Sequence, residues 1–129
     1  MKWLPLLLLV SCVIPTGMDF DNEYDIIEWV STHIDYVTDE QAWGVADYWQ
    51  TAAETLKRRK GDCEDFVILD MVLLNEIGVE SFMVLIPEHA ILRIGHSYWW
   101  TIIGTEEPRP DDIIMELGLP AVRALTGVR

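Results

Sequence analysis

The feature that most constrains this chain is a cysteine placed where a loop gives way to a helix. Residues 60–66 read Lys-Gly-Asp-Cys-Glu-Asp-Phe, and an apolar run follows them as far as Ile77. Apolar side chains in that run recur every three or four residues, as on one face of a helix. They are Phe66, Leu69, Leu73 and Ile77, with Val67, Met71 and Leu74 widening the stripe. Gly78 suits the left-handed position that closes a helix, so the pattern predicts a helix from about residue 63 to residue 77.

Cys63 lies in the first turn of this predicted helix, where opposing electrostatic effects act on it. Asp62 is a favourable N-cap, and Asp65 stands where a capping box carries Glu or Gln. Free backbone N–H groups and the helix dipole favour a thiolate here, whereas the acids Asp62, Glu64 and Asp65 raise the pKa of a thiol. A nucleophilic Cys63 therefore needs a cationic partner. The alternative is a buried core thiol, the commonest role for a lone cysteine before an apolar helix.

Several short motifs of this chain are similar to those of one bacterial family. They are Asp47-Tyr48-Trp49-Gln50, Glu54-Thr55-Leu56, Gly61-Asp62-Cys63-Glu64-Asp65-Phe66, Tyr36 with Asp39, Leu73-Leu74 with Gly78, and His89-Ala90. With them the chain resembles the bacterial transglutaminase-like cysteine peptidases over residues 24–104. The resemblance implies an α+β, papain-like or transglutaminase-like core, in which a cysteine-bearing helix packs on a small antiparallel sheet that carries the histidine. It also makes Trp43 and Trp49 candidates for the walls of a cleft.

Cysteine acyl transfer needs an imidazole to activate the thiol and protonate the leaving group. His33 lies on a predicted helix surface before the nucleophile, and His96 lies at a predicted hairpin tip. His89 begins the strand that follows the Cys63 helix and its next strand, and the family's His-Ala pair falls on it. We therefore expect Cys63 and His89 to be the catalytic pair. The alternative for His89 is a polar residue at the end of a strand.

The group that would orient the imidazole departs from the family's pattern. The family places Asp or Asn on the strand after the histidine, where this chain reads Trp100-Thr101-Ile102-Ile103-Gly104-Thr105. The only carboxylates between His89 and Asp111 are those of Glu106 and Glu107. The imidazole of His89 could be held by a backbone carbonyl, by Thr101, by Thr105 or by Glu106. It could also have no orienting group. Losing an orienting group costs several orders of magnitude in rate, so an inactive protein with this fold is an alternative.

Two further features of the site follow from the same motifs. The backbone N–H of Cys63 and the side chain of Gln50 are candidate donors to an oxyanion. In some relatives the acids flanking the cysteine hold calcium, which would point to Asp62 and Glu64, and two carboxylates in so short a span can contribute to an oxygen-ligated site. Helix capping and solvation explain both acids more simply. We therefore expect neither a metal nor a cofactor.

The first eleven residues have the character of an export signal. Lys2 is followed by an apolar stretch from Leu4 to Val10, too short to cross a bilayer. Leu9-Val10-Ser11-Cys12 resembles a bacterial lipobox, which implies lipidation of Cys12 and anchoring to a membrane surface. The alternative is an ordinary signal peptide cut a few residues later. Lipidation would leave Cys63 as a single thiol in an exported protein, whereas a Cys12–Cys63 disulfide would exclude catalysis.

The rest of the chain fits one acidic domain. We expect a tether at residues 12–20 and a single domain at 21–129. Lys and Arg number 9 against 22 Asp and Glu, a net charge of −13, which argues against nucleic acid as a partner. The expected protein is an exported, envelope-anchored lipoprotein, on the periplasmic or extracellular face, that acts as a monomer on a peptide or protein.

Local patterns predict the remaining elements. A helix should begin near Asp21, because Ile26, Ile27, Val30, Ile34 and Val37 share a face. We expect a loop at 38–44, then a helix from the capping box Thr51-Ala52-Ala53-Glu54 to about Lys60, ended by Gly61. Strands are expected at 81–86, 89–94 and 97–103, with a type II′ turn at Gly95-His96. Two short helices should follow at 112–117 and 120–125, Pro120 suiting a first turn.

Three functions are compatible with these observations. The first is a thiol-dependent acyl-transfer enzyme, a peptidase, amidase or transglutaminase, that uses Cys63 and His89. The second is a weak or inactive binding module that keeps the same fold on the cell envelope. The third is a purely structural envelope lipoprotein, which requires Cys63 to be buried or bonded. Reactivity of the Cys63 thiol across pH distinguishes a thiolate–imidazolium pair from a structural thiol.

Overall fold

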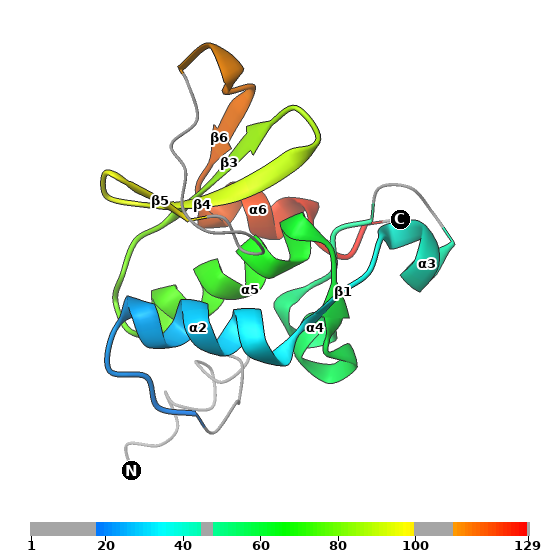
Figure 1. The fold of residues 1–129 in the computed structure, drawn as a ribbon, viewed down its shortest axis with the longest axis horizontal. Coiled ribbons are helices and arrows are strands. Elements are labelled where there is room, and N and C mark those ends of the chain that lie inside the picture. The colour runs from blue at the N-terminus through cyan, green and yellow to red at the C-terminus, as the bar shows by residue number, and fades with distance from the viewer. Residues whose placement is uncertain (1–17, 45–47, 100–109, 129) are drawn as a thin grey trace.

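The computed structural model describes residues 18–44, 48–99 and 110–128. Helix α5, Cys63–Glu76, lies at its centre (Figure 1). The Asp62 side chain accepts a hydrogen bond from the Asp65 N–H, and the Asp65 side chain accepts one from the Asp62 N–H. Ile77 caps the other end of α5, and Gly78 follows with φ of 81°. The predicted helix, its capping box and its left-handed glycine are confirmed.

A four-stranded antiparallel sheet packs on one side of α5 (Figure 1). Its order is β5-β4-β3-β6, with β3 at Phe82–Ile86, β4 at His89–Ile94, β5 at Ser97–Trp99 and β6 at Met115–Leu117. Pro87 and Glu88 form the turn between β3 and β4, and Gly95 and His96 form the turn between β4 and β5. Gly95 has φ of 57°, as the first central residue of a type II′ turn requires. The α+β class is therefore confirmed.

Helices and a short parallel strand pair surround the rest of α5. They are α2 at Glu23–His33, β1 at Asp35–Tyr36, α3 at Asp39–Trp43, α4 at Ala52–Arg58, β2 at Lys60–Gly61 and α6 at Leu119–Leu125. β1 and β2 run parallel, with the Asp35 N–H 2.9 Å from the Arg59 oxygen and the Val37 N–H 2.8 Å from the Gly61 oxygen. This pairing holds the segment before α3 against the loop that precedes Cys63.

The core lies between α5, α2 and the inner face of the sheet. Its fully buried apolar side chains include Ile26, Val30, Leu69, Leu73, Met83, Leu92 and Val122. Because α5 is covered by helices on some sides and by the sheet on another, apolar residues occupy most of its circumference. Within the described ranges no helix is long and apolar enough to cross a membrane.

The first half of the chain differs from prediction at three points. α2 ends at His33, so Ile34 caps the helix and Val37 lies beyond it. The expected loop at 38–44 contains α3, whose capping box joins Thr38 and Gln41. The helix that begins after Thr51 ends at Arg58 instead of Lys60, because Arg59 takes the left-handed conformation with φ of 58° and the chain then enters β2.

The second half differs mainly after residue 110. The predicted helix at 112–117 is wrong, because a 3-10 turn at Pro110–Asp112 leads into strand β6, which pairs with β3. The predicted helix at 120–125 is confirmed as α6, with Pro120 in its first turn. The predicted signal peptide and most of the tether lie outside the described residues. So does the end of the strand predicted at 97–103, of which β5 is the described part.

Candidate active site

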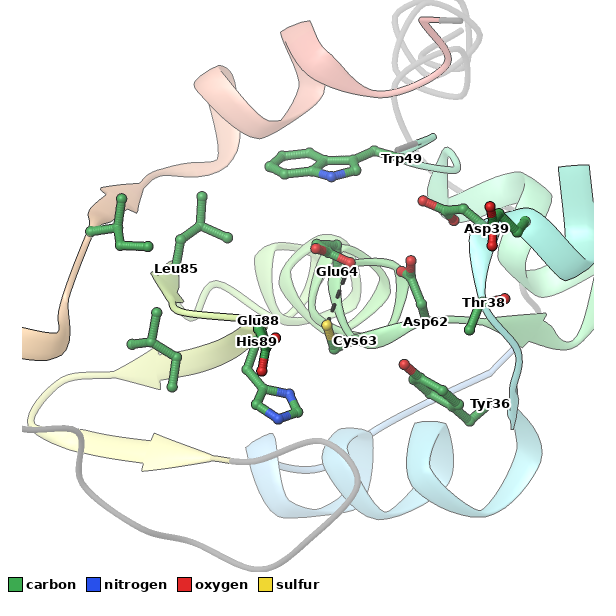
Figure 2. Close-up of a pocket in the computed structure, with 13 residues that line it drawn as sticks. Tyr36, Thr38, Asp39, Trp49, Asp62, Cys63, Glu64, Leu85, Glu88 and His89 are labelled. Carbon is green, nitrogen blue, oxygen red and sulfur yellow. Dashed lines mark hydrogen bonds between the residues drawn. The ribbon is translucent and has the colours of Figure 1, made fainter. Parts of the chain in front are cut away.

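Cys63 occupies the first position of α5, directly after its N-cap. It is a free thiol with an exposed fraction of 7%. Cys63 also lines a cavity of about 690 Å³ between α5, the β3–β4 turn and the segment around α3 (Figure 2). The backbone N–H groups in the first turn of a helix have no intrahelical acceptor. The thiol is therefore placed where a reacting carbonyl oxygen could find a backbone donor.

The immediate surroundings of the thiol favour its protonated form. Burial and the negative charge of Glu64 raise the pKa of Cys63 to about 12, and Asp62 adds to this, while a backbone hydrogen bond from Ala90 opposes it. The thiol donates to Glu64 Oε2 at 3.4 Å. Burial is the largest cause, and the neighbouring acids act in the same direction, as expected from the sequence. A base is consequently needed to make Cys63 nucleophilic near neutral pH.

His89 is the first residue of β4, and it lines the same cavity as Cys63 (Figure 2). The turn before it contains Glu88 with φ of 66°, a left-handed conformation that few residues other than glycine and asparagine adopt. The other two histidines lie away from the cavity. His33 stacks on Trp29 at the surface of α2, and His96 lies exposed at the β4–β5 turn. Of the three histidines, only His89 shares a cavity with the cysteine.

The cavity has walls of different character (Figure 2). Trp49 closes one side, as expected from the family's pattern. Leu85 and Ile86, at the end of β3, and Ile114, just before β6, form an apolar wall. The acidic residues of the lining are Asp39, Glu40, Asp62, Glu64 and Glu88. Among the described residues that line the cavity there is no lysine or arginine. The side chain of Trp43, the other expected wall residue, lies outside the description.

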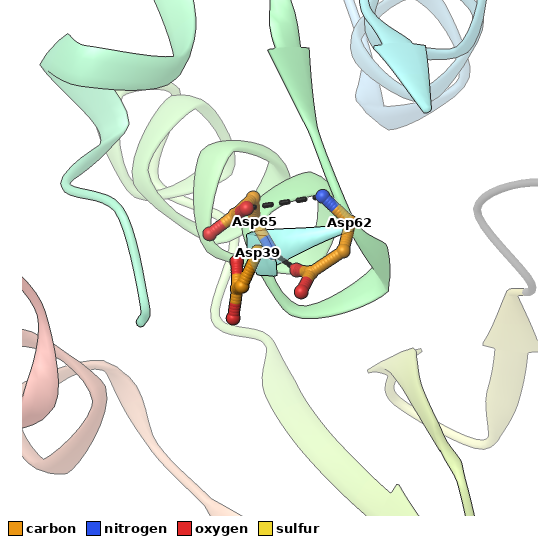
Figure 3. A group of neighbouring side chains, drawn as sticks. All are labelled: Asp39, Asp62 and Asp65. Atoms are coloured by element: carbon orange, nitrogen blue, oxygen red, sulfur yellow. Dashed lines mark hydrogen bonds between the residues drawn. The ribbon is translucent and has the colours of Figure 1, made fainter. Parts of the chain in front are cut away.

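Three carboxylates near the start of α5 form a compact group (Figure 3). One oxygen of each of Asp39, Asp62 and Asp65 lies within 4.8 Å of the others. Asp39 accepts from the Tyr48 N–H at 2.7 Å, and Asp65 accepts from the Gln50 N–H at 2.9 Å and the Asp62 N–H at 3.0 Å. The group thus fastens the segment at 48–50 to the start of α5. These bonds confirm the capping role expected for Asp62 and Asp65.

The proximity of these acids changes their protonation. Burial, then Asp65 and Glu64, raise the pKa of Asp62 to about 10, and burial raises that of Asp65 to about 6. The carboxyl group of Asp62 is therefore much harder to ionise than an exposed aspartate. Oxygen-only donors suit a hard cation such as Ca²⁺, and the side chains close enough to hold one together are those of Asp39, Asp62 and Asp65. Such an ion would offset the negative charge beside Cys63.

Sequence reasoning misjudged one side chain and missed others. Gln50, expected as an oxyanion donor, is fully buried, and its amide nitrogen donates to Thr55 Oγ1 and to the Lys60 oxygen. Its role is to hold the loop before Cys63. The contributions of Glu88 and Ile114 to the cavity carry no signal in the sequence, because they depend on the β3–β4 turn and on β6. Thr101, Thr105 and Glu106, the candidates for orienting His89, lie outside the described residues.

Similarity to known proteins identifies the family of this chain. No curated protein matches the chain. Among solved structures, LapG of Legionella pneumophila is similar, with 22% sequence identity and a TM-score of 0.44 over 81% of this chain; the match covers 62% of LapG. The sequence model described as bacterial transglutaminase-like cysteine proteinase BTLCP matches residues 16–94, which include the Cys63 helix and His89. The chain belongs to the family of bacterial transglutaminase-like cysteine proteinases.

Proposed function

We propose that this protein is a thiol-dependent acyl-transfer enzyme that acts on a peptide or amide bond with Cys63 as nucleophile and His89 as base. One observation carries the proposal: the cysteine at the start of α5 and the histidine at the start of β4 line one cavity large enough for a peptide segment. Membership of a cysteine proteinase family supports a peptide or protein as substrate. Release of the acyl group to water makes a peptidase, and release to an amine makes a transglutaminase.

The proposed reaction has two halves. In the first, His89 takes the thiol proton as Cys63 Sγ attacks the carbonyl carbon, and the tetrahedral oxyanion accepts from the backbone N–H of Cys63. The C–N bond then breaks, His89 gives its proton to the leaving amine, and a thioester remains on Cys63. In the second, His89 takes a proton from water or an amine as that nucleophile attacks the thioester carbon. The C–S bond then breaks, and His89 returns the proton to Cys63 Sγ, which restores the thiol. The raised pKa of Cys63 makes proton transfer to His89 part of the attack.

We also propose that residues 1–11 direct export and that Cys12, as a lipidated N-terminus, anchors the domain at 21–129 to an envelope membrane through the tether at 12–20. The Leu9-Val10-Ser11-Cys12 motif supports this. Metabolic labelling with a clickable fatty acid tests it, because wild type should incorporate the label and Cys12→Ser should not. Equal labelling of the two proteins would contradict lipidation at this cysteine.

Alkylation of Cys63 by iodoacetamide between pH 4 and 9 tests the proposed pair. The full-length protein carries Cys12→Ser, so that Cys63 is the only thiol, and adduct formation is followed by mass spectrometry. If His89 accepts the thiol proton, His89→Ala slows alkylation at pH 6–8 by at least about tenfold. His96→Ala is the matched control and should leave the rate unchanged. Glu64→Gln should speed alkylation, because it removes a negative charge beside the sulfur.

The second candidate function is a binding module that keeps the fold without turnover. The raised pKa of Cys63 is the observation that favours it. If wild type, His89→Ala and His96→Ala are alkylated at equal rates throughout the pH range, Cys63 is a structural thiol and the enzyme proposal is wrong. The cavity would then be studied as a binding site alone.

A further inference from the structure

We propose that the Tyr36 hydroxyl is a second donor to the oxyanion that forms when Cys63 attacks a carbonyl carbon. The inference rests on the proposed function only in taking Cys63 as the nucleophile. The backbone N–H of Cys63 supplies one donor, and a further donor aimed at the same oxygen stabilises the transition state more. Gln50, the expected second donor, does not fill this place, because its amide is buried and donates to Thr55 and Lys60.

The pairing of β1 with β2 brings Tyr36 to the site. Tyr36 is the last residue of β1, and its register partner in β2 is Gly61, two residues before Cys63. The next N–H along the chain, that of Val37, donates to the Gly61 oxygen at 2.8 Å. The main chain that carries the phenol is therefore fastened to the loop that leads into the nucleophile.

The phenol lines the same cavity as the proposed catalytic pair. Figure 2 shows the Tyr36 hydroxyl directed towards Cys63, with His89 on the other side of the sulfur. The imidazole has to reach the leaving group, to which it gives its proton, and the oxyanion is a different substituent of the tetrahedral carbon. A donor on the side of the sulfur away from His89 therefore meets the oxyanion without obstructing the imidazole.

The Tyr36 side chain is available to a bound molecule. It is 51% exposed, so its ring is not needed to fill the core. Among the described residues, none forms a hydrogen bond with its hydroxyl. By contrast, Tyr48 is buried, and its hydroxyl donates to Glu54 Oε1 at 2.6 Å. A phenol that faces a cavity without a partner is a donor that a ligand can use.

The charges around the phenol keep it protonated. Burial raises the pKa of Tyr36 above its usual value of about 10, and four ionised neighbours add to this. In order of effect they are Cys63, Asp62, Glu64 and Asp39. The hydroxyl is therefore a donor throughout the neutral pH range. Because a Coulomb interaction weakens with distance, the first place of Cys63 in this order agrees with a phenol close to the sulfur.

Thr38 and Trp49 also line the cavity and carry donors, but both are placed less well. The Thr38 hydroxyl accepts the Gln41 N–H at 3.2 Å in the capping box of α3, which holds the side chain towards that helix. The Trp49 indole lies across the cavity, and in Figure 2 Glu64 stands between it and the sulfur. Tyr36 is therefore the side-chain donor that best fits an oxyanion beside Cys63.

Acetylation of Cys63 by p-nitrophenyl acetate probes this step without a particular peptide. Sγ bonds to the acetyl carbon, the thiol proton passes to His89, and the C=O electron pair moves onto the oxygen that the two donors hold. The pair then returns, the C–O bond breaks, and p-nitrophenolate leaves, while His89 releases its proton to solvent. Tyr36 keeps its proton throughout. Iodoacetamide alkylates the same sulfur by displacement of iodide, a reaction in which no oxyanion forms.

The first release of p-nitrophenol and the rate of alkylation are measured at about pH 7.5 in full-length Cys12→Ser protein, with the release caused by a Cys63→Ala variant subtracted. Tyr36→Phe should slow acetylation at least about tenfold and leave alkylation unchanged, because the ring stays and only the donor is lost. Tyr24→Phe removes a hydroxyl from an exposed residue of α2, outside the cavity lining. It is the matched control and should change neither rate.

Equal acetylation with and without the Tyr36 hydroxyl would overturn the inference, as would a loss seen only with Trp49→Phe. An equal loss in both reactions would also overturn it, because Tyr36 would then act on the thiol. Absence of Cys63 acetylation in the Cys12→Ser protein would refute the inference and the enzyme proposal together.

His89→Ala in the same two reactions separates the inference from the proposed function. If His89→Ala keeps both rates while Tyr36→Phe loses acetylation alone, the inference stands and the Cys63–His89 pair is wrong. If His89→Ala slows both reactions while Tyr36→Phe slows neither, the pair stands and Tyr36 is not a donor to the oxyanion.

Discussion

Replacing Gly61 with alanine tests whether the loop before Cys63 is as closely packed as the structure shows. An alanine Cβ at this position would lie 2.6 Å from Asp65 Cβ and 3.1 Å from Gln50 Nε2. Real Cβ atoms do not approach carbon so closely, so Asp65 must shift. The Asp65 carboxylate accepts the N–H groups of Gln50 and Asp62, and Gly61 does not have positive φ. Steric overlap, not backbone conformation, is therefore the predicted cause of damage.

The expected loss can be estimated from those two hydrogen bonds. A bond to a charged group contributes about 1.5–3 kcal/mol, so disturbing both costs about 3–6 kcal/mol of the free energy of unfolding. Reducing the freedom of the unfolded chain returns about 0.4–1 kcal/mol. Gly61→Ala should therefore lower the free energy of unfolding by about 2–5.5 kcal/mol and Tm by about 10–20 °C.

Urea unfolding followed by circular dichroism measures the loss, and iodoacetamide alkylation of Cys63 shows whether the start of α5 has moved. Gly78→Ala is the matched control, because a Cβ there meets nothing within 4 Å and φ is 81°. It should lose about 1–2 kcal/mol from conformation alone and leave alkylation unchanged. A Gly61→Ala protein that is as stable as wild type, or more stable, would refute the reasoning about steric overlap.

Two further predictions concern charged groups. Burial raises the pKa of Asp62 to about 10 and that of Asp70 well above its usual range. The folded state therefore holds protons that the unfolded state releases above about pH 4, and the free energy of unfolding should fall by at least about 1 kcal/mol per unit from pH 5.5 to pH 8. Asp62→Asn should flatten this slope in urea titrations; a flat wild-type profile would contradict it. Arg93 donates to Glu116 at 2.9 and 2.6 Å, joining β4 to β6 across β3. A double-mutant cycle with alanine should give a coupling of about 0.5–1 kcal/mol that falls with salt, and zero coupling at low salt would rule the contribution out.

The parts of the fold that sequence could predict are those fixed by local chemistry. The capping boxes at Asp62 and Thr51 were recognisable because they need only residues three apart. The stripe from Phe66 to Ile77 and the turn at Gly95-His96 are equally local. These local patterns predict the Cys63 helix and the strand that carries His89. The family's motifs fall on the same two elements of the candidate site.

The parts that sequence reasoning missed depend on distant partners. β6 reads Met-Glu-Leu, which has no sequence pattern typical of a strand. It is a strand because its backbone pairs with β3. β1 is similar, since Asp35 and Tyr36 pair with a segment that follows α4. Gln50 was placed in the site by its neighbours in sequence, but three-dimensional packing turns its amide toward Thr55 and Lys60.

The order of the sheet also bears on how the protein avoids aggregating. β3 reads Phe-Met-Val-Leu-Ile, without a charge or a proline, which is the composition of segments that assemble into intermolecular sheets. One edge of β3 pairs with β4, which follows it directly in the chain. The other edge pairs with β6, which is synthesised about thirty residues later, so this edge stays unpaired for longer. Until then the open edge can recruit the same segment of another chain. By covering the open edge of β3, β6 thus prevents this strand from pairing with another copy of the protein. Truncation before residue 115 should therefore cause the protein to aggregate.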